Sequence, residues 1–358
     1  MARIDAILKL VKEQGASDLH MTTGSPPMVR INGEITPIPY EPLTREMSEL
    51  LLFEIMDAAN RARYDQNKDV DFSSEVPGVV RARCNLYEQN KGPAGAFRIL
   101  PSQILSMEQL GLPDHLVRLT EMPRGLVVVT GPPGTGKSST LAALLDHINR
   151  TRRKHILTIE DPIEYKHLNK QCLITQREVG RNTPSFAKAL HGALREDPDV
   201  IMVGEMRDPE TMSLAITAAA TGQLVFATLH TMSAAQTVDR ILDSFQDERQ
   251  QQVRLMLSES LKAVLAQRLI KRRDGKGRAL ALEILIGTPA VASLIRERKT
   301  FQLGSIIQTG KREGMQTVDE SVLALVRQGV VAPEDAAPHV SNRDLLNGAA
   351  GGGWLEAA

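Results

Sequence analysis

The sequence predicts an α/β protein in which a small α+β domain precedes a larger domain built around a mainly parallel sheet. From about residue 116 onward, short apolar runs alternate with segments of helical periodicity, as in parallel sheets that helices cover on both faces. Before residue 100, several strand-like runs are interspersed with only two helical segments, which is typical of a small α+β domain. The length of 358 residues is sufficient for two such domains.

The N-terminal domain is predicted to span residues 1–100. Apolar residues recur at helical spacing over residues 3–14, and Thr44 is a suitable N-cap for a second helix over residues 44–59. Asn32-Gly33 favours a type I′ turn in a hairpin. The expected strands are residues 17–21, 28–31, 34–36, 79–88 and 94–100. Nothing in these residues pairs a nucleophile with a base, so we expect this domain to serve regulation or assembly rather than catalysis.

The last predicted hairpin of this domain contains two arginines, Arg83 and Arg98. Because side chains alternate along a strand, the apolar neighbours Cys84 and Phe97 turn both arginines toward the opposite face. With the turn near residues 90–93, the two arginines should lie close together. On these residues alone, a pair of solvated surface arginines is favoured. The alternative is a cationic pair that reaches the phosphates bound by a neighbouring subunit.

The second domain is predicted to span residues 116–345, after a linker at residues 101–115. Its expected strands are residues 126–129, 156–159, 200–203, 224–227 and 280–286. Its expected helices are residues 137–150, 185–196, 209–221 and 234–269, followed by a helical C-terminal portion. Residues 346–358, rich in glycine and alanine, are expected to form a flexible tail. Ligands of such sheets bind at the carboxyl ends of the strands, so the residues after each strand are the candidates for a functional site.

The most specific motif follows the first strand of this domain, where residues 131–138 read G-x-x-x-x-G-K-S, the phosphate-binding loop of nucleoside triphosphatases. Its glycines allow backbone N–H groups to surround a phosphate, Lys137 supplies a positive charge, and the Ser138 hydroxyl is a suitable Mg²⁺ ligand. The predicted nucleotide-binding residues here are Gly131, Pro132, Pro133, Gly134, Thr135, Gly136, Lys137, Ser138 and Ser139. The apolar strand before the loop and the helix after it are the context that this motif requires. A nucleoside triphosphate and Mg²⁺ are therefore the expected cofactors.

Polar side chains also follow the next three strands. Glu160, Asp161 and Glu164 follow the second strand, Glu205 follows the third, and His230 follows the fourth. We assign Glu205 the role of general base or water-orienting residue, and Glu160 and Asp161 the metal shell and the nucleotide edge. Ser138, Glu160 and Glu205 are the predicted metal-binding residues, and His230 is placed to sense the γ-phosphate. Taken singly, each carboxylate could instead cap a helix, and His230 could be a histidine at the edge of the core.

Composition argues against several classes of function. Lys plus Arg equals Asp plus Glu at 43 residues each, so no overall basic charge is available to hold nucleic acid or an anionic membrane. The two cysteines, Cys84 and Cys172, can build neither a disulfide framework nor a CxxC zinc site. No apolar run is long enough to cross a bilayer, and residues 1–5 do not resemble a signal peptide, so we expect a soluble intracellular protein. The basic residues 271–278 lack interleaved aromatic residues and are interpreted as a solvated loop.

Together these motifs resemble those of the secretion and pilus-motor ATPases, over residues 3 to about 340. Besides the phosphate loop, the resemblance rests on residues 16–20, on residues 158–164 (similar to the Asp box), on residues 194–208 (similar to the Walker B region) and on residues 221–231 (similar to the His box). Within the family, the chain is most similar to the type IV pilus retraction ATPases.

The resemblance implies a RecA-like motor domain behind a PAS-like N-terminal domain, assembled as a homohexameric ring with ATP between the two domains. It implies an ATPase that drives pilus retraction and twitching motility at the cytoplasmic face of the inner membrane. The implied partners are an inner-membrane platform protein and, indirectly, pilin, without nucleic acid. Arg83 and Arg98 match the arginines of the family that complete the site, and Glu205 matches the Walker B carboxylate because it follows Gly204.

Some residues depart from the family pattern. Residues 290–297 resemble the C-terminal AIRNLIRE signature of retraction motors, but Ala292 and Ser293 stand in place of its Arg and Asn. Gln223 and Ala220 replace a usual His and a common Glu. A principal retraction motor and a paralogue of it both remain open. The alternatives are a pilus-extension or type II secretion ATPase, a RecA-like nucleic-acid translocase, and a nucleotide-binding module without turnover.

Overall fold

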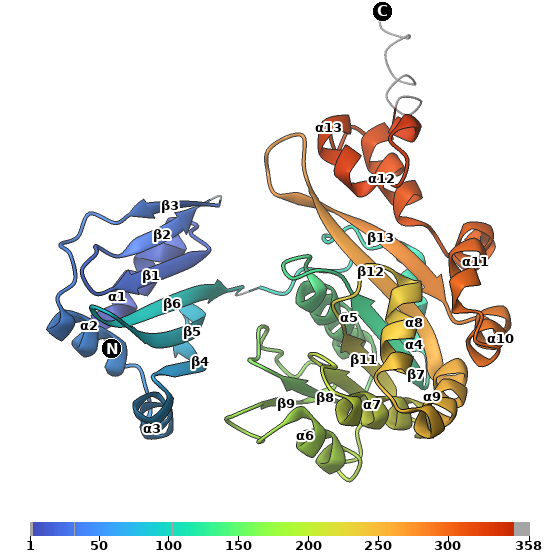
Figure 1. Cartoon of the computed structure of the whole chain (residues 1–358), viewed down its shortest axis with the longest axis horizontal. Helices are drawn as coiled ribbons and strands as arrows, with labels where there is room; N and C mark the ends of the chain where they lie inside the picture. Colours follow the sequence, from blue (N-terminus) through green and yellow to red (C-terminus); the bar gives the residue numbers. More distant parts are fainter. Residues whose placement is uncertain (1–2, 32, 102, 347–358) are drawn as a thin grey trace, which may run out of the picture. The chain divides into compact units, whose positions relative to one another are not determined.

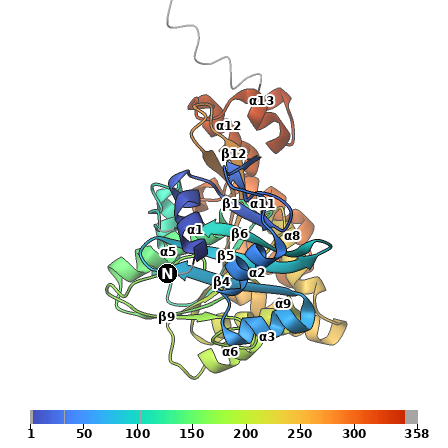
Figure 2. The same cartoon turned by 90° about the vertical axis from the view of Figure 1, so that its left-hand side faces the viewer.

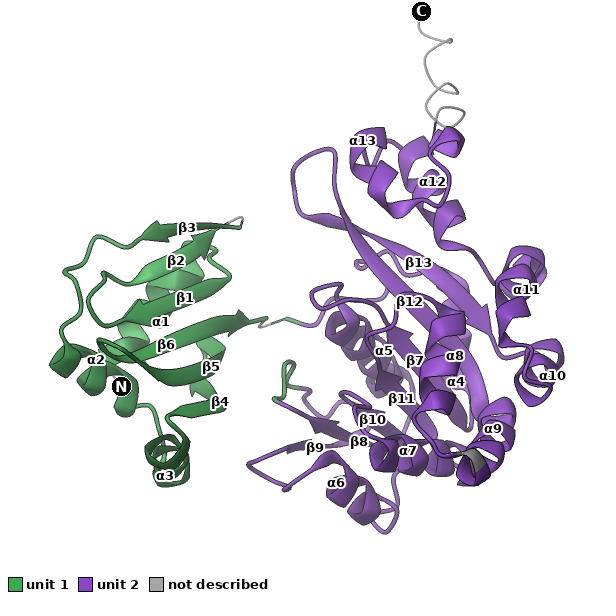
Figure 3. Cartoon of the chain, in the orientation of Figure 1, with its two compact units in different colours: residues 1–103, 162–166 green, residues 104–161, 167–358 purple. Residues whose placement is uncertain are grey.

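The computed structural model describes residues 3–31, 33–101 and 103–346, and these residues form two compact units. Unit 1 comprises residues 1–103 and 162–166, and unit 2 comprises residues 104–161 and 167–358 (Figure 3). The boundary therefore falls within the predicted linker at residues 101–115. Met107 and Leu112, at the end of that linker, are buried in the core of unit 2.

Unit 1 contains a six-stranded antiparallel sheet in the order β3-β2-β1-β6-β5-β4 (Figure 1). Its strands are β1 (Asp18–Thr22), β2 (Met28–Ile31), β3 (Glu34–Pro37), β4 (Asp69–Val76), β5 (Val80–Gln89) and β6 (Gly92–Leu100). The prediction missed β4, because only its apolar residues Val70 and Phe72 alternate clearly before Ser73-Ser74-Glu75 interrupt the pattern. Pairing with β5 along its whole length provides the missing stabilisation. The predicted type I′ turn includes Asn32, which lies outside the described residues.

Helices α1 (Arg3–Glu13) and α2 (Arg45–Phe53) pack on this sheet (Figure 2), and α3 (Ala58–Asn67) follows them in the chain. The helices contribute Ile4, Leu8 and Leu52 to a core that also contains Leu19 and Phe97 from the sheet. Thr44 caps α2 as expected, since its hydroxyl accepts a hydrogen bond from the amide of Met47 at 3.2 Å. The single helix expected over residues 44–59 is two helices, because Asp57 forms a second N-cap with the amide of Asn60.

Unit 2 contains a seven-stranded sheet in the order β13-β12-β7-β11-β10-β8-β9. Its strands are β7 (Gly125–Thr130), β8 (His155–Glu160), β9 (Leu173–Glu178), β10 (Val200–Val203), β11 (Leu224–Thr228), β12 (Leu261–Lys271) and β13 (Arg278–Ile286). All neighbouring pairs are parallel except β12–β13, so the predicted mainly parallel α/β sheet is confirmed. The PAS-like character of the N-terminal domain stays a prediction.

Helices cover both faces of this sheet. The helices that connect its strands are α5 (Lys137–Thr151), α6 (Phe186–Ala193), α7 (Pro209–Thr221), α8 (Ala234–Asp243) and α9 (Asp247–Ser260), and α4 (Val117–Glu121) precedes β7. The connection β7–α5–β8 runs across the sheet in the opposite direction to the connections that contain α6, α7, α8 and α9. Because crossovers between parallel strands are right-handed, α5 lies on one face and the other four helices on the opposite face. None of the helices within the described ranges combines the length and the apolar composition needed to span a bilayer.

The prediction of a helix over residues 234–269 is wrong in its last quarter, where the chain forms β12 (Leu261–Lys271). Its apolar residues, among them Leu261, Val264 and Leu265, also fit a helical period. In the structure, β12 lies between β7 and β13 and is buried on both faces over most of its length, so buried and solvent-facing residues do not alternate along it to reveal the strand period. An apolar run of this kind cannot be assigned from periodicity alone.

The C-terminal portion is helical, as predicted. It consists of α10 (Pro289–Arg296), α11 (Leu303–Thr309), α12 (Val318–Arg327) and α13 (Pro333–Ala336), with short 3₁₀ turns at Thr300–Gln302, Lys311–Glu313 and Ala337–His339. A further 3₁₀ turn, Asp114–Leu116, precedes α4. The segment that resembles the AIRNLIRE signature forms α10. The predicted tail begins at Leu346, which is buried, while the rest of it (347–358) lies outside the described residues.

Candidate nucleotide site

The phosphate loop leaves the sheet at the end of β7, whose six residues are all buried. Gly131, Gly134 and Gly136 have φ values of 138°, 79° and 84°, in the region where only glycine is unstrained. At Gly131 space is a second constraint, because a Cβ there would lie 2.5 Å from the backbone oxygen of Gln267. The loop then enters α5, so its amides and the helix N-terminus present the positive end of the backbone dipoles to one point.

Lys137 is 8% exposed and lies under the loop. Its ammonium donates hydrogen bonds to the backbone oxygens of Gly131 at 2.8 Å and Pro132 at 3.0 Å. It also lies 3.3 Å from Nδ1 of His230. Since an ammonium has no acceptor, it must donate to this nitrogen, which leaves Nε2 of the histidine to carry the proton.

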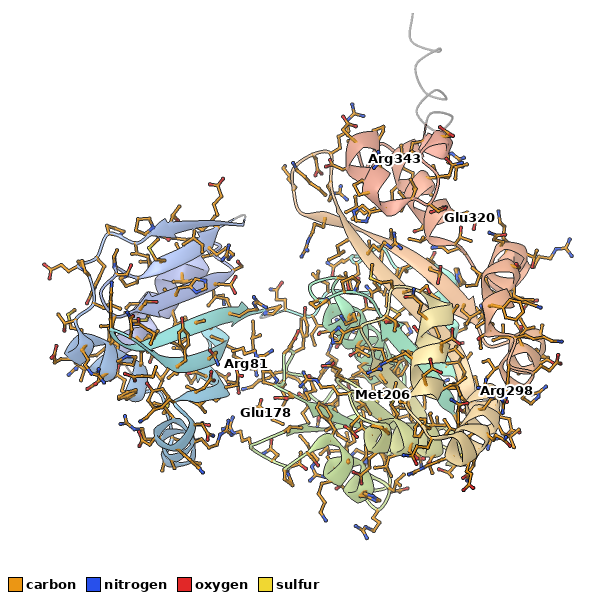
Figure 4. The ribbon with its side chains drawn as sticks, viewed as in Figure 1. Arg81, Glu178, Met206, Arg298, Glu320 and Arg343 are labelled. Carbon is orange, nitrogen blue, oxygen red and sulfur yellow. The ribbon has the colours of Figure 1, made fainter. Side chains whose placement is uncertain are left out.

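The strand ends that follow in the sheet meet beside this loop. The amide of Leu229 donates to the oxygen of Val129 at 3.2 Å, which joins the end of β11 to β7. The amide of Gly204 donates to the oxygen of Ile159 at 2.8 Å, which joins the end of β10 to β8. Met206, labelled in Figure 4, is buried, and its amide donates to the oxygen of Thr228 at 3.1 Å. The segment that contains Glu205 is therefore fixed on both sides.

Glu205 and His230 form the centre of the site. Nε2 of His230 lies 2.8 Å from Oε1 of Glu205, so the proton on Nε2 is donated to the carboxylate. The other oxygen of Glu205 accepts from Nε of Arg207 at 2.7 Å, and Arg207 lies 4.0 Å from Asp161. The side chain of Glu205 is 19% exposed, so its interactions are less screened than those of a surface pair. A continuous series of polar contacts thus runs from Lys137 to Asp161.

Glu160 ends β8 and is 7% exposed. Its Oε1 accepts hydrogen bonds from the hydroxyl of Thr158 at 2.7 Å and from Nε2 of Gln176 at 3.1 Å. Its Cα lies 3.4 Å from the position that a Cβ on Gly204 would occupy, so Glu160 and Glu205 come from neighbouring strand ends. Lys137, His230 and Glu205 are therefore in contact, and Glu160 lies at the neighbouring strand end; their joint role in nucleotide binding stays a prediction.

Glu164 is grouped differently from the other predicted residues, because residues 162–166 belong to unit 1. There, Arg81 donates hydrogen bonds to the backbone oxygens of Ile163 at 2.7 Å and of Glu164 at 3.3 Å. Arg81, labelled in Figure 4, is 14% exposed and also lies 3.9 Å from Glu75. Arg81 thus holds the segment that follows Asp161, and a role of Glu164 in nucleotide binding stays a prediction.

Arg83 and Arg98 are directly opposite each other on β5 and β6, as the strand alternation predicts. Arg98 donates through Nε to Asp18 at 2.9 Å, and Arg83 lies 3.8 Å from Asp71. The Asp18 carboxyl loses solvation by partial burial, but hydrogen bonds from Ser17 and Arg98 lower its pKa overall. Both arginines belong to unit 1.

The sequence analysis missed a series of hydroxyl groups that joins the phosphate loop to the segment containing His230. Thr130 lies 2.7 Å from the hydroxyl of Thr231, and Thr231 lies 2.7 Å from the hydroxyl of Thr237. Thr237 in turn donates to the backbone oxygen of Ser233 at 2.8 Å. The helical spacing of Ser233 and Thr237 is a signal for the last contact, but the first depends on the neighbouring positions of β7 and β11 in the sheet.

The residues at this edge fit a nucleotide bound with Mg²⁺. Within the described part of the chain, the Ser138 hydroxyl makes no side-chain hydrogen bond, so its oxygen is open to a cation. Glu205 and Glu160 add carboxylate oxygens, and hard oxygen ligands are those that Mg²⁺ prefers. Mg²⁺ commonly keeps several water ligands, so a small number of protein oxygens is sufficient.

Comparisons with known proteins agree with the family resemblance that the motifs indicate. Residues 1–338 match the family model described as Type II/IV secretion system protein. The chain is 52% identical to the Type IV pilus retractation ATPase PilT of Pseudomonas aeruginosa, over 93% of this chain and 96% of that protein. It is 39% identical to the Type IV pilus ATPase PilU of the same organism, over 96% of this chain and 90% of that protein. A crystal structure of the pilus retraction motor PilT with bound ADP superposes with a TM-score of 0.87 at 45% identity, covering 96% of this chain and 98% of that one.

These matches extend over both units and not only over the phosphate loop, so they confirm the resemblance deduced from the motifs. The chain belongs to the Type II/IV secretion system protein family, and within it to the pilus retraction ATPases.

Proposed function

We propose that this chain is the ATP-hydrolysing subunit of a homohexameric motor that retracts type IV pili. The observation that supports this most directly is the contact series in which His230 joins Lys137 of the phosphate loop to the carboxylate of Glu205. The similarity to a retraction ATPase over nearly the full length of both chains supports the biological role.

Each of these residues has a distinct task. The loop amides and Lys137 bind the phosphates of ATP, and bound Mg²⁺ supplies further charge neutralisation there. Ser138, Glu205 and Glu160 are the residues that hold this ion, directly or through water. Glu205, whose carboxylate is held in place by donors on both oxygens, orients the attacking water and accepts its proton.

His230 detects the state of the nucleotide. It lies between the cation that binds the phosphates and the carboxylate that directs water, so a change in charge at Lys137 alters the hydrogen bond to Glu205. His230 also begins the segment that leads to α8 (Ala234–Asp243). Loss of the γ-phosphate would thereby be transmitted to a whole helix, which is the kind of movement a motor requires.

Arg83 and Arg98 are proposed to act in trans, on the nucleotide of the adjacent subunit in the ring. Their adjacent positions on one sheet face suit them to bind a phosphate together. The further partners, an inner-membrane platform protein and through it pilin, are proposed from the family alone. So is the location at the cytoplasmic face of the inner membrane.

The purified full-length protein provides the test. Lys137→Ala should abolish ATP binding and hydrolysis, whereas Glu205→Gln should still bind ATP but release phosphate at least about a hundredfold more slowly, the usual size of a general-base contribution. A nucleotide-binding module without turnover would release phosphate equally slowly in the wild type and in the Glu205→Gln variant. A nucleic-acid translocase would be stimulated by single-stranded DNA, and a pilus motor would not.

A further inference from the structure

The hairpin formed by β12 (Leu261–Lys271) and β13 (Arg278–Ile286) contacts the phosphate loop through two side chains that no motif includes. Arg278, the first residue of β13, donates through Nη1 to the backbone oxygen of Gly134 at 3.1 Å. Gln267 of β12 is 1% exposed and places its Nε2 3.4 Å from the backbone oxygen of Thr135. Both contacts are made to carbonyl groups of the loop.

Contacts to these carbonyls bear directly on phosphate binding. A loop that points its N–H groups inward at an anion must point its carbonyl oxygens outward, and donors on the outside hold each peptide in that orientation. Lys137, which is itself a residue of the loop, donates hydrogen bonds to the oxygens of Gly131 and Pro132. Arg278 and Gln267 provide them for Gly134 and Thr135 from the hairpin.

The side chain of Gln267 also contains a buried acceptor that lowers stability. Its Oε1 is buried without a hydrogen-bond partner among the described residues. A buried polar atom without a partner lowers the stability of the folded state. The same amide group therefore has an oxygen that lowers stability and an N–H group that contacts the phosphate loop.

The outer part of the same hairpin packs against the C-terminal helices. Ile270 and Ala279 belong to a separate small core with Val322 of α12 and Val331. The backbone is also joined there, since the amide of Arg273 donates to the oxygen of Val330 at 2.9 Å. The hairpin thus connects the C-terminal helices to the two loop carbonyls.

We propose that Arg278 and Gln267 are positioning residues that hold the phosphate loop in its nucleotide-binding form, and that the C-terminal helices set nucleotide affinity through them. This rests on the nucleotide-binding function proposed above. Neither residue takes part in the chemical step, so both act on affinity for the nucleotide and not on the rate at saturation.

The test measures ADP binding by titration calorimetry, ATP turnover and thermal unfolding on the full-length protein. Arg278→Ala should weaken ADP binding and raise the KM for ATP by roughly threefold to tenfold, the value of one hydrogen bond, with kcat unchanged. Arg278→Lys should recover part of this loss. Lys276→Ala removes the same charge from the turn of the same hairpin, without a contact to the loop, and should bind ADP as the wild type does.

Gln267→Leu distinguishes positioning from general structural support. It removes the unpartnered Oε1 together with the donor, so the unfolding temperature should stay the same or rise while ADP affinity falls. Unchanged ADP affinity in both Arg278→Ala and Gln267→Leu would overturn the inference, as would a parallel loss of affinity and stability in Gln267→Leu. If the wild type itself failed to bind ADP, the proposed function would be the statement refuted.

Discussion

The ammonium of Lys137 lies 3.3 Å from Nδ1 of His230, although 93 residues separate them in the chain. The contact exists because β7 and β11 are neighbours in the sheet and run in parallel, so both strands end at the same edge. Through it, the lysine of the phosphate loop is connected to the carboxylate of Glu205.

His230 should control turnover more than nucleotide binding. His230→Ala removes both the acceptor for Lys137 and the donor for Glu205, and we expect ATP turnover to fall by about a hundredfold while ADP affinity changes only severalfold. His230→Gln can present an amide oxygen and an amide N–H in similar places and should recover part of the activity. Equal turnover in wild type and His230→Ala would show that the contact series has no catalytic role.

Arg98 should act on the site of a neighbouring subunit. Arg98→Ala and Glu205→Gln should each be nearly inactive alone, but a mixture of the two proteins should regain part of the ATPase activity. Recovery is expected because a mixed ring contains some sites with Glu205 from one subunit and Arg98 from the next. A mixture that remains as inactive as its components would place both residues in the same subunit's site. Asp18→Asn is the control for the ion pair that Arg98 makes within its own unit.

The approach of β12 to the end of β13 requires a glycine at position 287. A Cβ on Gly287 would lie 2.0 Å from the backbone oxygen of Leu261, so Gly287→Ala must displace the backbone and should lower the unfolding temperature strongly. At Gly304, in α11, the position that a Cβ would occupy has no atom of the described residues within 4 Å, and Gly304→Ala should stabilise the protein by about 0.5–1 kcal/mol. If the packing is as described, the unfolding temperature should fall in Gly287→Ala and rise in Gly304→Ala.

Stability should fall in mild acid because of His167. Burial is the main cause that lowers the pKa of His167 to about 4, and the nearby charge of Lys170 lowers it further while Asp146 opposes both. Because the folded-state pKa lies below the unfolded value of about 6.5, the stability associated with neutral, buried His167 is fully present above pH 6.5. It is lost as the pH falls toward 4 and the histidine must take up a proton. The loss amounts to at most about 3 kcal/mol.

The variant His167→Leu should therefore show a flatter dependence of unfolding temperature on pH between 6.5 and 4. His191, which is exposed on the same unit, serves as the control, and His191→Gln should retain the slope of the wild type. A slope that is the same in all three proteins would assign the acid sensitivity to other groups.

Local patterns were sufficient to predict the phosphate loop and the strand ends around it. Residues 131–138 specify the loop because the backbone angles at its glycines, and the roles of Lys137 and Ser138, depend on immediate neighbours in the chain. Glu160, Glu205 and His230 could be grouped because the carboxyl ends of parallel strands meet at one edge. The facing of Arg83 and Arg98 followed from the two-residue period of a strand.

Other features could not be predicted from local patterns. Residues 261–271 are apolar enough to fit a helix or a strand, and only their place between β7 and β13 decides in favour of a strand. The assignment of residues 162–166 to unit 1, through Arg81, also depends on a contact between segments more than eighty residues apart.

The sequence by itself therefore determined which residues form the candidate nucleotide site, since short motifs specify them. The tertiary structure alone decided which of them touch, and it added Gln267 and Arg278 as supports of the phosphate loop. The physical reason is that hydrogen bonds act over about 3 Å, so they depend on which strands become neighbours when the sheet assembles.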